Sequence, residues 1–344
     1  MRVSFLCPFN LNRPTGTPSR ARTTITAASL VGEVHIISNT KGCTFFAFTR
    51  RALALLKDQK PDVIHGVTSV SVPAFLLYRY FFSPRVHLVF EMHGWAWAEL
   101  AQEHKPFTRF ALLLFDIVGL NCAHAVIVMS HTQKEFVSRW TFNSGRILVL
   151  WGPVDSLPPF ISASHEGPLV VGYLGNSSWW QGLHYLLNAA VLLKDDSSFT
   201  FRLAGFNTSE LENFPHIPSI QYQGILKESE VLPFWRGCNV LISPRLPGVV
   251  SNLQFPHKLS GYLSAGRPVI VSSTNDQAHI VREAQCGLVV DPLNAESLAQ
   301  ALKEFAQLSQ EEQQKMGERA SHFAHKHFSP EILVTTLKKL YVVK

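Results

Sequence analysis

Short apolar segments alternate with helical segments along almost the whole chain, and this alternation constrains the fold more than any other feature. Five such segments have the length and composition of buried strands: Ala125–Met129, Leu169–Leu174, Phe199–Ala204, Val240–Ser243 and Val269–Ser272. Between such segments, apolar residues recur at helical spacing, for example from Leu183 to Leu193. Strands that alternate with helices are typical of parallel sheets covered by helices on both faces. The sequence therefore predicts an α/β protein with doubly wound parallel sheets.

The alternation occurs in two successive series, which indicates two domains. Residues 156–168 separate the series and are rich in Ser, Pro, Gly and His without periodicity, as in a linker. A chain of 344 residues accommodates two domains of ordinary size. We predict an N-terminal Rossmann-like domain over residues 1–160 and a C-terminal one over residues 161–328, with a cleft between them. Ser329-Pro330-Glu331 predicts the start of a final helix over residues 329–344, and Ser130 with Gln133 and Ser309 with Glu312 match helix capping boxes.

The stretch Asn239–Ser273 has the pattern strand, loop, helix, strand, with the helix beginning near Phe255. In parallel sheets, ligands bind at the carboxyl ends of strands, where the N–H groups of the following helix favour anions. Arg245 and Lys258 lie on either side of the loop in this stretch. We therefore expect an anion-binding crevice here.

Two residues of the first series also lie in loops that directly follow predicted strands. His93 follows the predicted strand Val86–Phe90, and Gly16 lies in the loop after Val3–Cys7. A role at a ligand site fits both positions. The alternatives are a structural hydrogen-bonding role for His93 and a plain turn at Gly16. Ser19, at the end of the same loop, could cap a helix through Leu30.

Cysteine usage and the amino terminus indicate a reducing compartment. The five cysteines are widely scattered, so neither a disulfide framework nor a zinc site is indicated, and we expect them to be reduced and buried. The apolar run at the start of the chain is too short for a secretion signal. Cytoplasmic residence is the expectation.

Charge is divided unevenly along the chain. Residues 1–165 contain sixteen Lys and Arg against nine Asp and Glu, so the first half is basic. An anionic acceptor or a membrane surface would explain this, and a scatter of solvated side chains is the alternative. Nucleic acid is not expected, because no basic run is interleaved with aromatic residues. Phe107–Leu120 is too short to span a hydrocarbon core of about 30 Å, which leaves a core helix or a helix on a membrane surface.

Several motifs of the second series, taken together and in this order, resemble the carboxyl half of the family-four glycosyltransferases of GT-B fold, the group 1 type. They are Gly172-Tyr173-Leu174-Gly175 with Gln181-Gly182, Leu203-Ala204-Gly205, Ile242-Ser243-Pro244-Arg245, Phe255-Pro256-His257-Lys258 and Tyr262 to Ile270. The first series is similar to the acceptor domain of that family, with Gly16 in its glycine loop and His93-Gly94 at the cleft.

The resemblance implies a retaining, metal-independent transferase without a cofactor, which moves a sugar from a nucleotide-sugar donor to a sugar, glycan or lipid-linked acceptor. It implies that the C-terminal domain holds the nucleotide and that the last helix crosses back to the first domain. Lys258 and Arg245 would stabilise the diphosphate, His93 would lie near the sugar, and Gly16 would let the backbone approach the donor. Such an enzyme would act in polysaccharide biosynthesis, in the cytoplasm or peripherally at the inner face of the membrane.

Three positions depart from the pattern of the family. Asn176 and Gln181 stand where members commonly have the arginine and lysine that clamp the diphosphate, and Gly261 stands where many have a glutamate that holds the ribose. A charged hydrogen bond is about twice as strong as a neutral one. The departures therefore motivate two alternatives: a non-catalytic GT-B homologue that binds a partner or sugar, and a GT-B sugar phosphorylase or epimerase.

Overall fold

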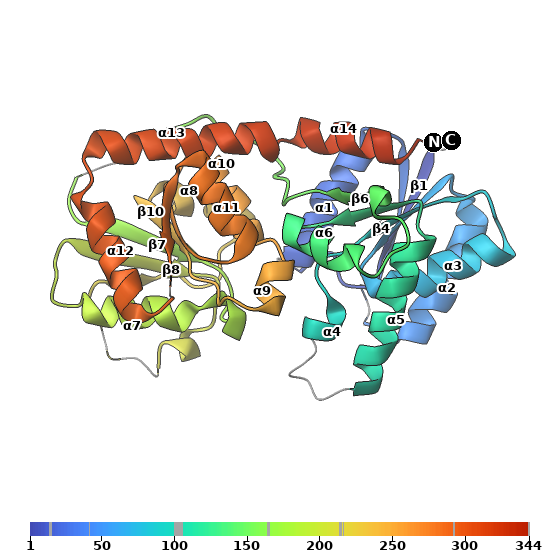
Figure 1. Ribbon diagram of the computed structural model, residues 1–344, viewed down its shortest axis with the longest axis horizontal. Helices are drawn as coiled ribbons and strands as arrows, with labels where there is room; N and C mark the ends of the chain where they lie inside the picture. The colour runs from blue at the N-terminus through green and yellow to red at the C-terminus, as the bar shows by residue number, and fades with distance from the viewer. Residues whose placement is uncertain are drawn as a thin grey trace. The chain divides into compact units, whose positions relative to one another are not determined.

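The chain forms two compact units (Figure 1). A computed structural model describes residues 1–13, 16–40, 42–99, 106–163, 166–212, 215, 217–291 and 293–342. The first unit comprises Met1–Asp155, Leu253–Phe255 and Ser329–Lys344, and the second comprises Ser156–Asn252 and Pro256–Phe328. The sequence placed the boundary after residue 160 and assigned nothing of the segment Leu253–Phe255 to the first domain.

The first unit is built on a six-stranded parallel sheet in the order β2-β1-β3-β4-β5-β6. Its strands are β1 Arg2–Cys7, β2 Glu33–Ser38, β3 Val63–Val67, β4 His87–Glu91, β5 Ala125–Val128 and β6 Ile147–Val149. The chain moves from β1 to β2 on one side and then returns to β3 on the other. The carboxyl ends of β1 and β3 therefore flank a topological switch point, where α/β proteins bind ligands.

Helices cover both faces of this sheet, as the alternation predicts. They are α1 Gly16–Ser29, α2 Phe45–Gln59, α3 Val72–Phe81, α4 Ala96–Glu99, α5 Pro106–Cys122, α6 His131–Ser138 and α14 Pro330–Leu340. Helix α3 packs between α2 and α5, whereas α1 packs against α14 (Figure 1). The core between helices and sheet is apolar, with Phe48, Phe75 and Phe90 almost fully buried.

The expected cap at Ser19 was wrong, because α1 begins at Gly16 and Ser19 lies inside its first turn. Pro18 is tolerated there because the first N–H groups of a helix have no intrahelical acceptor.

Helix α5 contributes to the core of this unit and also has exposed apolar residues. Leu120 is buried in the core, and Leu113, Phe115 and Ile117 are partly buried against it. Phe107, Phe110, Leu114 and Val118 are exposed.

The second unit contains another six-stranded parallel sheet, in the order β12-β11-β10-β7-β8-β9. Its strands are β7 Leu169–Leu174, β8 Phe199–Ala204, β9 Ile220–Tyr222, β10 Val240–Ser243, β11 Val269–Ser272 and β12 Gly287–Val290. Counted within the unit, this is the order of a dinucleotide-binding fold, 3-2-1-4-5-6. The switch point lies between β7 and β10, whose residues Val240 and Leu241 pair with Val171 and Gly172.

The helices of this unit pack in pairs on the sheet. They are α7 Leu183–Leu192, α8 Glu228–Arg236, α9 Val249–Leu253, α10 His257–Ser264, α11 Asn275–Ala284, α12 Ala295–Gln307 and α13 Gln310–His327. Helix α7 packs against α12, and α10 packs against α13. The predicted helix near Phe255 corresponds to α10, whereas the short α9 before it was not anticipated.

The predicted helix starts at Ser130, Ser309 and Ser329 are confirmed. The hydroxyl oxygens accept hydrogen bonds from the backbone N–H groups of Gln133 at 2.9 Å, Glu312 at 3.2 Å and Ile332 at 3.3 Å. Within the described ranges, no helix combines the length and hydrophobicity needed to cross a bilayer.

All five cysteines are free thiols, and three of them are buried as expected. Cys43 is only half-buried and Cys122 is exposed at the end of α5, so the prediction of burial was wrong for these two. Both lie in the first unit and outside its sheet.

Candidate active site

The second unit gathers positive charge at its switch point. Gly175 directly follows β7, and Arg245 follows β10 and is almost fully buried. The carbonyl oxygen of Arg245 accepts a hydrogen bond from the Ser272 hydroxyl at the end of β11. Lys258, in the first turn of α10, points its ammonium nitrogen at Gly175, where an added Cβ would lie 2.7 Å from Nζ. The absence of a side chain at Gly175 therefore makes room for the lysine.

The ammonium group of Lys258 is buried and has no hydrogen-bond partner in the part of the chain that the structure describes. It lies over the Tyr173 ring, 4.2 Å from the ring centroid. Burial and the nearby Arg245 charge both disfavour the charged amine, and the pKa of Lys258 is held well below its ordinary value. A buried cation beside a second cation is stabilised by an anion, so the arrangement suits a negatively charged ligand.

The loop after β7 packs against the loop after β10. Gly182 has a φ of 68°, and a Cβ there would overlap the carbonyl oxygen of Pro244. The backbone N–H of Leu246 donates to the carbonyl oxygen of Trp180 at 3.0 Å. Gln181, between them, has a buried side-chain oxygen without a partner among the described atoms. Gln181 therefore lies in the same loop cluster as Arg245.

Asn176 is exposed and forms hydrogen bonds within the turn to which it belongs. Its side-chain oxygen accepts from the backbone N–H of Ser178 at 3.1 Å, and its carbonyl oxygen accepts from the Tyr173 hydroxyl at 2.8 Å. These contacts shape the loop beside Lys258.

Gly261 lies three residues after Lys258, in the middle of α10 and against the indole of Trp235. An added Cβ would lie 2.2 Å from Cη2 of that ring. Tyr262, the next residue, packs edge-on against Trp235 and binds both backbone groups of Leu174, accepting from its N–H at 3.1 Å and donating to its carbonyl oxygen at 3.2 Å. The aromatic ring therefore fills the space in which a longer side chain at residue 261 would begin.

In the first unit, Gly16 is the exposed first residue of α1, after the switch-point strand β1. An exposed helix start at a switch point remains accessible to a ligand.

His93 follows β4 and belongs to a buried cluster centred on Glu91. Its Nε2 lies 3.0 Å from Oε1 of Glu91, and its side chain is only 6% exposed. The other ring nitrogen, Nδ1, is buried without a partner among the described atoms. Burial lowers the pKa of His93, against the opposing effect of Glu91. The ring is therefore held neutral near neutral pH.

Glu91 itself is fully buried and accepts hydrogen bonds on both oxygens. Arg20 Nε donates to Oε1 at 2.7 Å, and His65 Nε2 lies 2.9 Å from Oε2. Burial alone would raise the pKa of Glu91, but the Arg20 charge and the two histidine hydrogen bonds hold it well below its ordinary value. The remaining Arg20 nitrogens donate to the carbonyl oxygens of Trp151 and Leu150, each at 2.9 Å.

Sequence reasoning missed this cluster, which comprises Arg20, His65, Glu91, His93 and Tyr341 (the Glu91 cluster). The Tyr341 hydroxyl of the segment after α14 lies 2.7 Å from Nδ1 of His65 and completes it. One signal was available, because an acidic residue at the end of an apolar strand must be paired when it is buried. The other members of the cluster had no local signal, since His65 and Tyr341 alone are 276 residues apart.

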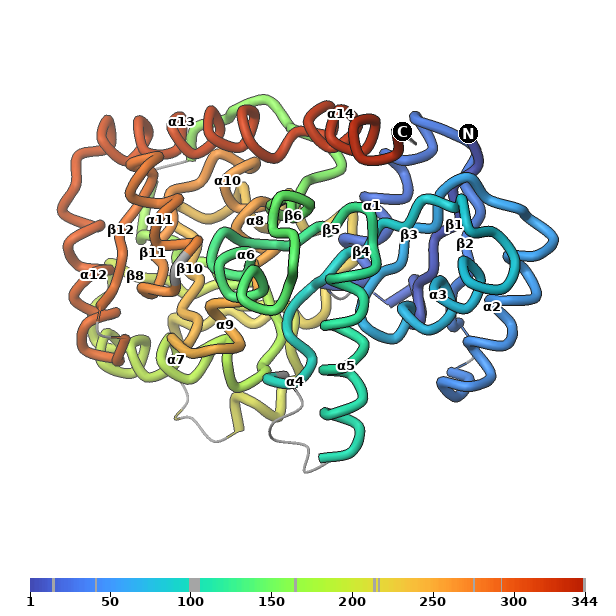
Figure 2. The backbone as a smooth tube through the Cα atoms, turned by 45° about the vertical axis from the view of Figure 1, so that its right-hand side comes forward, coloured from blue at the N-terminus to red at the C-terminus, as the bar shows by residue number. Residues whose placement is uncertain are grey.

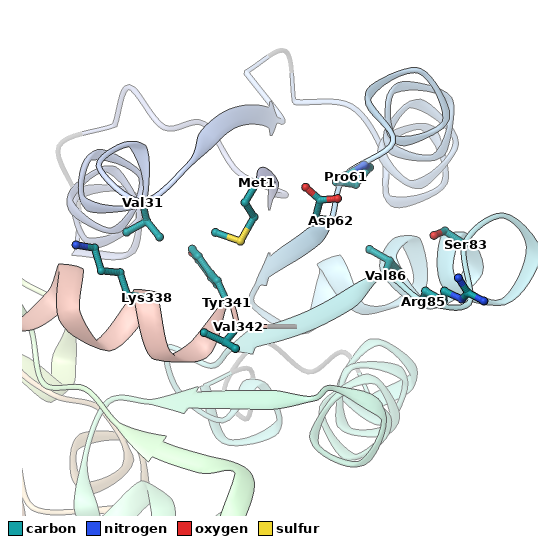
Figure 3. Close-up of a pocket in the computed structure, with 10 residues that line it drawn as sticks. All are labelled: Met1, Val31, Pro61, Asp62, Ser83, Arg85, Val86, Lys338, Tyr341 and Val342. Atoms are coloured by element: carbon teal, nitrogen blue, oxygen red, sulfur yellow. The ribbon is translucent and has the colours of Figure 1, made fainter. Parts of the chain in front are cut away.

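The first unit also has a pocket of about 580 Å³ (Figure 3). Met1, Asp62 and Val86, which line it, immediately precede β1, β3 and β4, and Lys338 and Tyr341 line it from the other side. It lies at the amino ends of the strands, the edge opposite His93 and Gly16. Ligands of parallel α/β sheets bind at the carboxyl ends, so this pocket is not the candidate active site.

Both halves of the chain match known protein families. Residues 168–307 match the family model "Glycosyl transferases group 1", and residues 1–151 match the "Glycosyl transferase 4-like domain". Glucosyltransferase 3 of Streptococcus gordonii is 36% identical over 92 residues, a match that spans only 26% of this chain and 26% of that protein.

Solved structures share the fold along nearly the whole chain. Sucrose-phosphate synthase from Thermosynechococcus elongatus aligns with a TM-score of 0.83 at 15% identity, covering 99% of this chain and 98% of that one. HepE of Anabaena, in complex with UDP-glucose, aligns with a TM-score of 0.75 at 14% identity, covering 98% of each chain. With both halves matched to its family models and both sheets matching its fold, the chain belongs to the group 1 glycosyltransferases of GT-B fold.

Proposed function

We propose that this glycosyltransferase transfers a sugar from a nucleoside diphosphate donor, with retention of anomeric configuration and without a metal ion. The single observation that carries the proposal is the buried ammonium group of Lys258, which has no hydrogen-bond partner among the described residues and lies beside Arg245 at the switch point of the second unit. Negative charge develops on the leaving diphosphate during transfer. Fixed cations aimed at that charge lower the barrier, and they supply the stabilisation that a divalent ion provides elsewhere.

In this proposal Arg245 and Lys258 bind the diphosphate, and Asn176 and Gln181 contribute neutral hydrogen bonds from the adjacent loop. Each would donate to the diphosphate through its side-chain NH2 group; Gln181 is half-buried, whereas Asn176 is exposed. Gly261 contributes no side chain, so the ribose is bound without a carboxylate from that position. Gly16 and His93 lie at the substrate site of the first unit, where His93 contacts a hydroxyl group of the reacting sugar.

Ligand binding and transfer are tested separately. A thermal-shift titration with UDP, GDP and ADP and their sugars should stabilise the protein, by about 2.7 kcal/mol at a hundred times the dissociation constant. UDP-glucose is the first choice, because HepE has been solved with it. NMR of the product then reports the anomeric configuration, and repetition with EDTA reports metal dependence. If no nucleotide shifts the transition, the proposal fails; binding without turnover in any acceptor mixture would favour a non-catalytic homologue.

We also propose that the acceptor is a glycan or lipid-linked sugar and that the protein reaches it at an anionic membrane surface through α5. Four apolar residues of this helix share one exposed face: Phe107, Phe110, Leu114 and Val118 (the α5 stripe). Exposure falls from 90% at Phe107 to 38% at Val118. Helix α5 projects past the edge of the sheet at its amino-terminal end (Figures 1 and 2). An exposed apolar stripe on a helix is suited to the interface of a bilayer.

Charge favours an anionic surface as the occupant of the α5 stripe. The only acidic residue of the described helix, Asp116, is buried and accepts a hydrogen bond from Ser69 at 2.5 Å. Arg109 is the basic residue of the helix, and the first half of the chain has an excess of Lys and Arg over Asp and Glu. Attraction of basic residues to anionic lipid adds to the apolar contribution.

Vesicle co-sedimentation tests this surface. The protein should bind vesicles that contain an anionic phospholipid, and replacing Phe107 and Phe110 together by Ser should weaken binding about tenfold or more. Ile225→Ser, at a residue of the second unit that is 61% exposed, is the matched control and should leave binding unchanged. Equal vesicle binding by the double variant and the control would exclude the α5 stripe as the membrane-binding surface. A concentration-dependent dimer that the double variant abolishes would instead identify the stripe as an interface with a second copy of the chain.

A further inference from the structure

We propose that Glu91 is a positioning residue that holds His93 as the Nε2–H tautomer and so presents the lone pair of Nδ1 to a hydroxyl group of the substrate. The inference rests on the proposed function, in which His93 lies at the reacting sugar. It goes further in assigning the direction of the hydrogen bond and the residues that fix it.

The tautomer follows from the acceptor. An ionised carboxylate only accepts hydrogen bonds, and Glu91 is kept ionised by Arg20, whose Nε lies 2.7 Å from Oε1. The nitrogen of His93 that lies 3.0 Å from the same oxygen, Nε2, must therefore carry a proton. A neutral ring has only one such proton, so Nδ1 is an acceptor.

His65 provides an internal comparison, because it contacts the same carboxylate through the same ring atom. Its Nε2 lies 2.9 Å from Oε2 of Glu91, which makes it a donor too. Its Nδ1 then accepts from the Tyr341 hydroxyl at 2.7 Å. Both nitrogens of His65 are thus satisfied within the protein, whereas Nδ1 of His93 has no partner in the described chain. Of the two histidines, only His93 is left to accept a further hydrogen bond.

The Glu91 carboxylate is fixed by hydrogen bonds on both of its oxygens. His65 and Tyr341 fix Oε2, and Arg20 fixes Oε1 while donating to two backbone carbonyl groups between β6 and the linker. The titratable and charged groups around His93 are Glu91, Arg20 and His65. A hydrogen bond from a histidine ring to a fixed carboxylate sets the orientation and the tautomer of the ring at functional sites.

The tautomer can be measured directly on the wild-type protein. In a sample with ¹⁵N-labelled histidine, NMR should show His93 neutral at neutral pH, protonated on Nε2 and unprotonated on Nδ1. Addition of a nucleotide sugar that binds should move the Nδ1 resonance in the direction of an accepted hydrogen bond. A proton on Nδ1, or a doubly protonated ring, would overturn the inference even if the enzyme is active.

Kinetics of matched variants provide the second test. His93→Asn places an amide near the position of Nδ1, and His93→Gln places one near the position of Nε2. We expect kcat to be about tenfold higher in His93→Asn than in His93→Gln, the equivalent of one hydrogen bond, with similar dissociation constants for the nucleotide alone. The opposite order would assign the catalytic contact to Nε2 and reject the inference.

Glu91→Gln tests the positioning role through the pH profile. Loss of the negative charge should lower the pKa of His93 further, so the acid limb of kcat should move to lower pH while its plateau falls. A residue with a merely structural role would reduce the amount of active enzyme without moving the limb, and that result would reject the role of Glu91. If Glu91→Gln does not fold because Arg20 loses its partner, the NMR measurement and the His93 variants still decide. Absence of transfer in the wild type with the expected tautomer would instead reject the proposed function alone.

Discussion

The ammonium nitrogen of Lys258 lies over the face of Tyr173, 4.2 Å from the ring centroid. The ring is fixed by its hydroxyl, which donates to the carbonyl oxygen of Asn176 at 2.8 Å. A cation–π contact contributes about 2 kcal/mol when desolvated and offers the amine no hydrogen-bond acceptor. The loop after β7 therefore holds the lysine in place and leaves its N–H groups for a ligand.

Replacement of this cation should weaken nucleotide binding. We expect Lys258→Ala and Arg245→Ala each to raise the dissociation constant for a nucleoside diphosphate about tenfold to a hundredfold, because each removes a charged hydrogen bond. Isothermal titration calorimetry measures the effect. Lys303→Ala, at an exposed lysine of α12 in the same unit, is the control and should bind like the wild type. Unchanged binding in both site variants would place the diphosphate elsewhere.

Nucleotide binding should also take up a proton at Lys258. Burial and Arg245 lower the pKa of the free amine well below its ordinary value, whereas a bound phosphate favours the ammonium form. Wherever the free amine is neutral, binding therefore requires protonation, and affinity should fall by at most about tenfold per pH unit as pH rises above the pKa of the free protein.

Calorimetry in buffers of different ionisation enthalpy reveals the proton uptake, and Lys258→Met should bind the nucleotide weakly and without proton uptake. An affinity that is independent of pH above the last ionisation of the diphosphate would contradict this assignment.

The stability of the free protein should change with pH in the opposite direction to the nucleotide affinity. The unfolded chain holds the Lys258 proton more tightly than the folded one, so the free energy of unfolding rises with pH between the folded and unfolded pKa values of Lys258.

Much of the fold followed from periodicity alone, because strands buried on both faces are apolar throughout and their ends can be recognised. Leu169–Leu174 and Phe199–Ala204 were predicted with the bounds that the structure gives to β7 and β8. Helix starts depend on single side chains and were less certain. Ser130 was identified because Gln133 completes a capping box with it, whereas Ser19 has no such partner at residue 22 and lies inside α1.

The candidate site was only partly predictable, since strand order decides which loops meet. Arg245 and Lys258 could be placed in one crevice because they flank a loop that leaves a strand. Neither the contact between Lys258 and Gly175 nor that between Trp235 and Gly261 has a sequence signal, because each joins segments from different parts of the unit. The Glu91 cluster likewise depends on contacts between α1, β3, β4 and the segment after α14.

Removal of the His93 side chain should impair turnover more than donor binding. The ring is expected to contact the sugar and not the diphosphate, so His93→Ala should lower kcat at least about tenfold while changing the dissociation constant of the free nucleotide by less than about twofold. Steady-state kinetics and calorimetry on the same preparation measure the two effects. His184→Ala, at an exposed histidine of α7, is the control. A fully active His93→Ala enzyme would remove this residue from the mechanism.

The tight contact between Gly261 and Trp235 predicts that even a methyl group at residue 261 is destabilising. The added Cβ of Gly261→Ala would lie 2.2 Å from the indole, and overpacking of this kind costs about 1–3 kcal/mol in the free energy of unfolding. Urea denaturation measures the cost. Gly248→Ala is the matched control, because nothing lies within 4 Å of a Cβ there.

Trp235→Phe should recover part of the loss in the Gly261→Ala background, since the smaller ring lacks the indole atoms nearest the new methyl group. A double-mutant cycle then gives the coupling energy between the two positions. Equal stability of Gly261→Ala and Gly248→Ala would mean that the indole moves aside freely. In that case the volume beside α10 would be open to a ribose-binding side chain, and Gly261→Glu should then strengthen nucleotide binding instead of unfolding the unit.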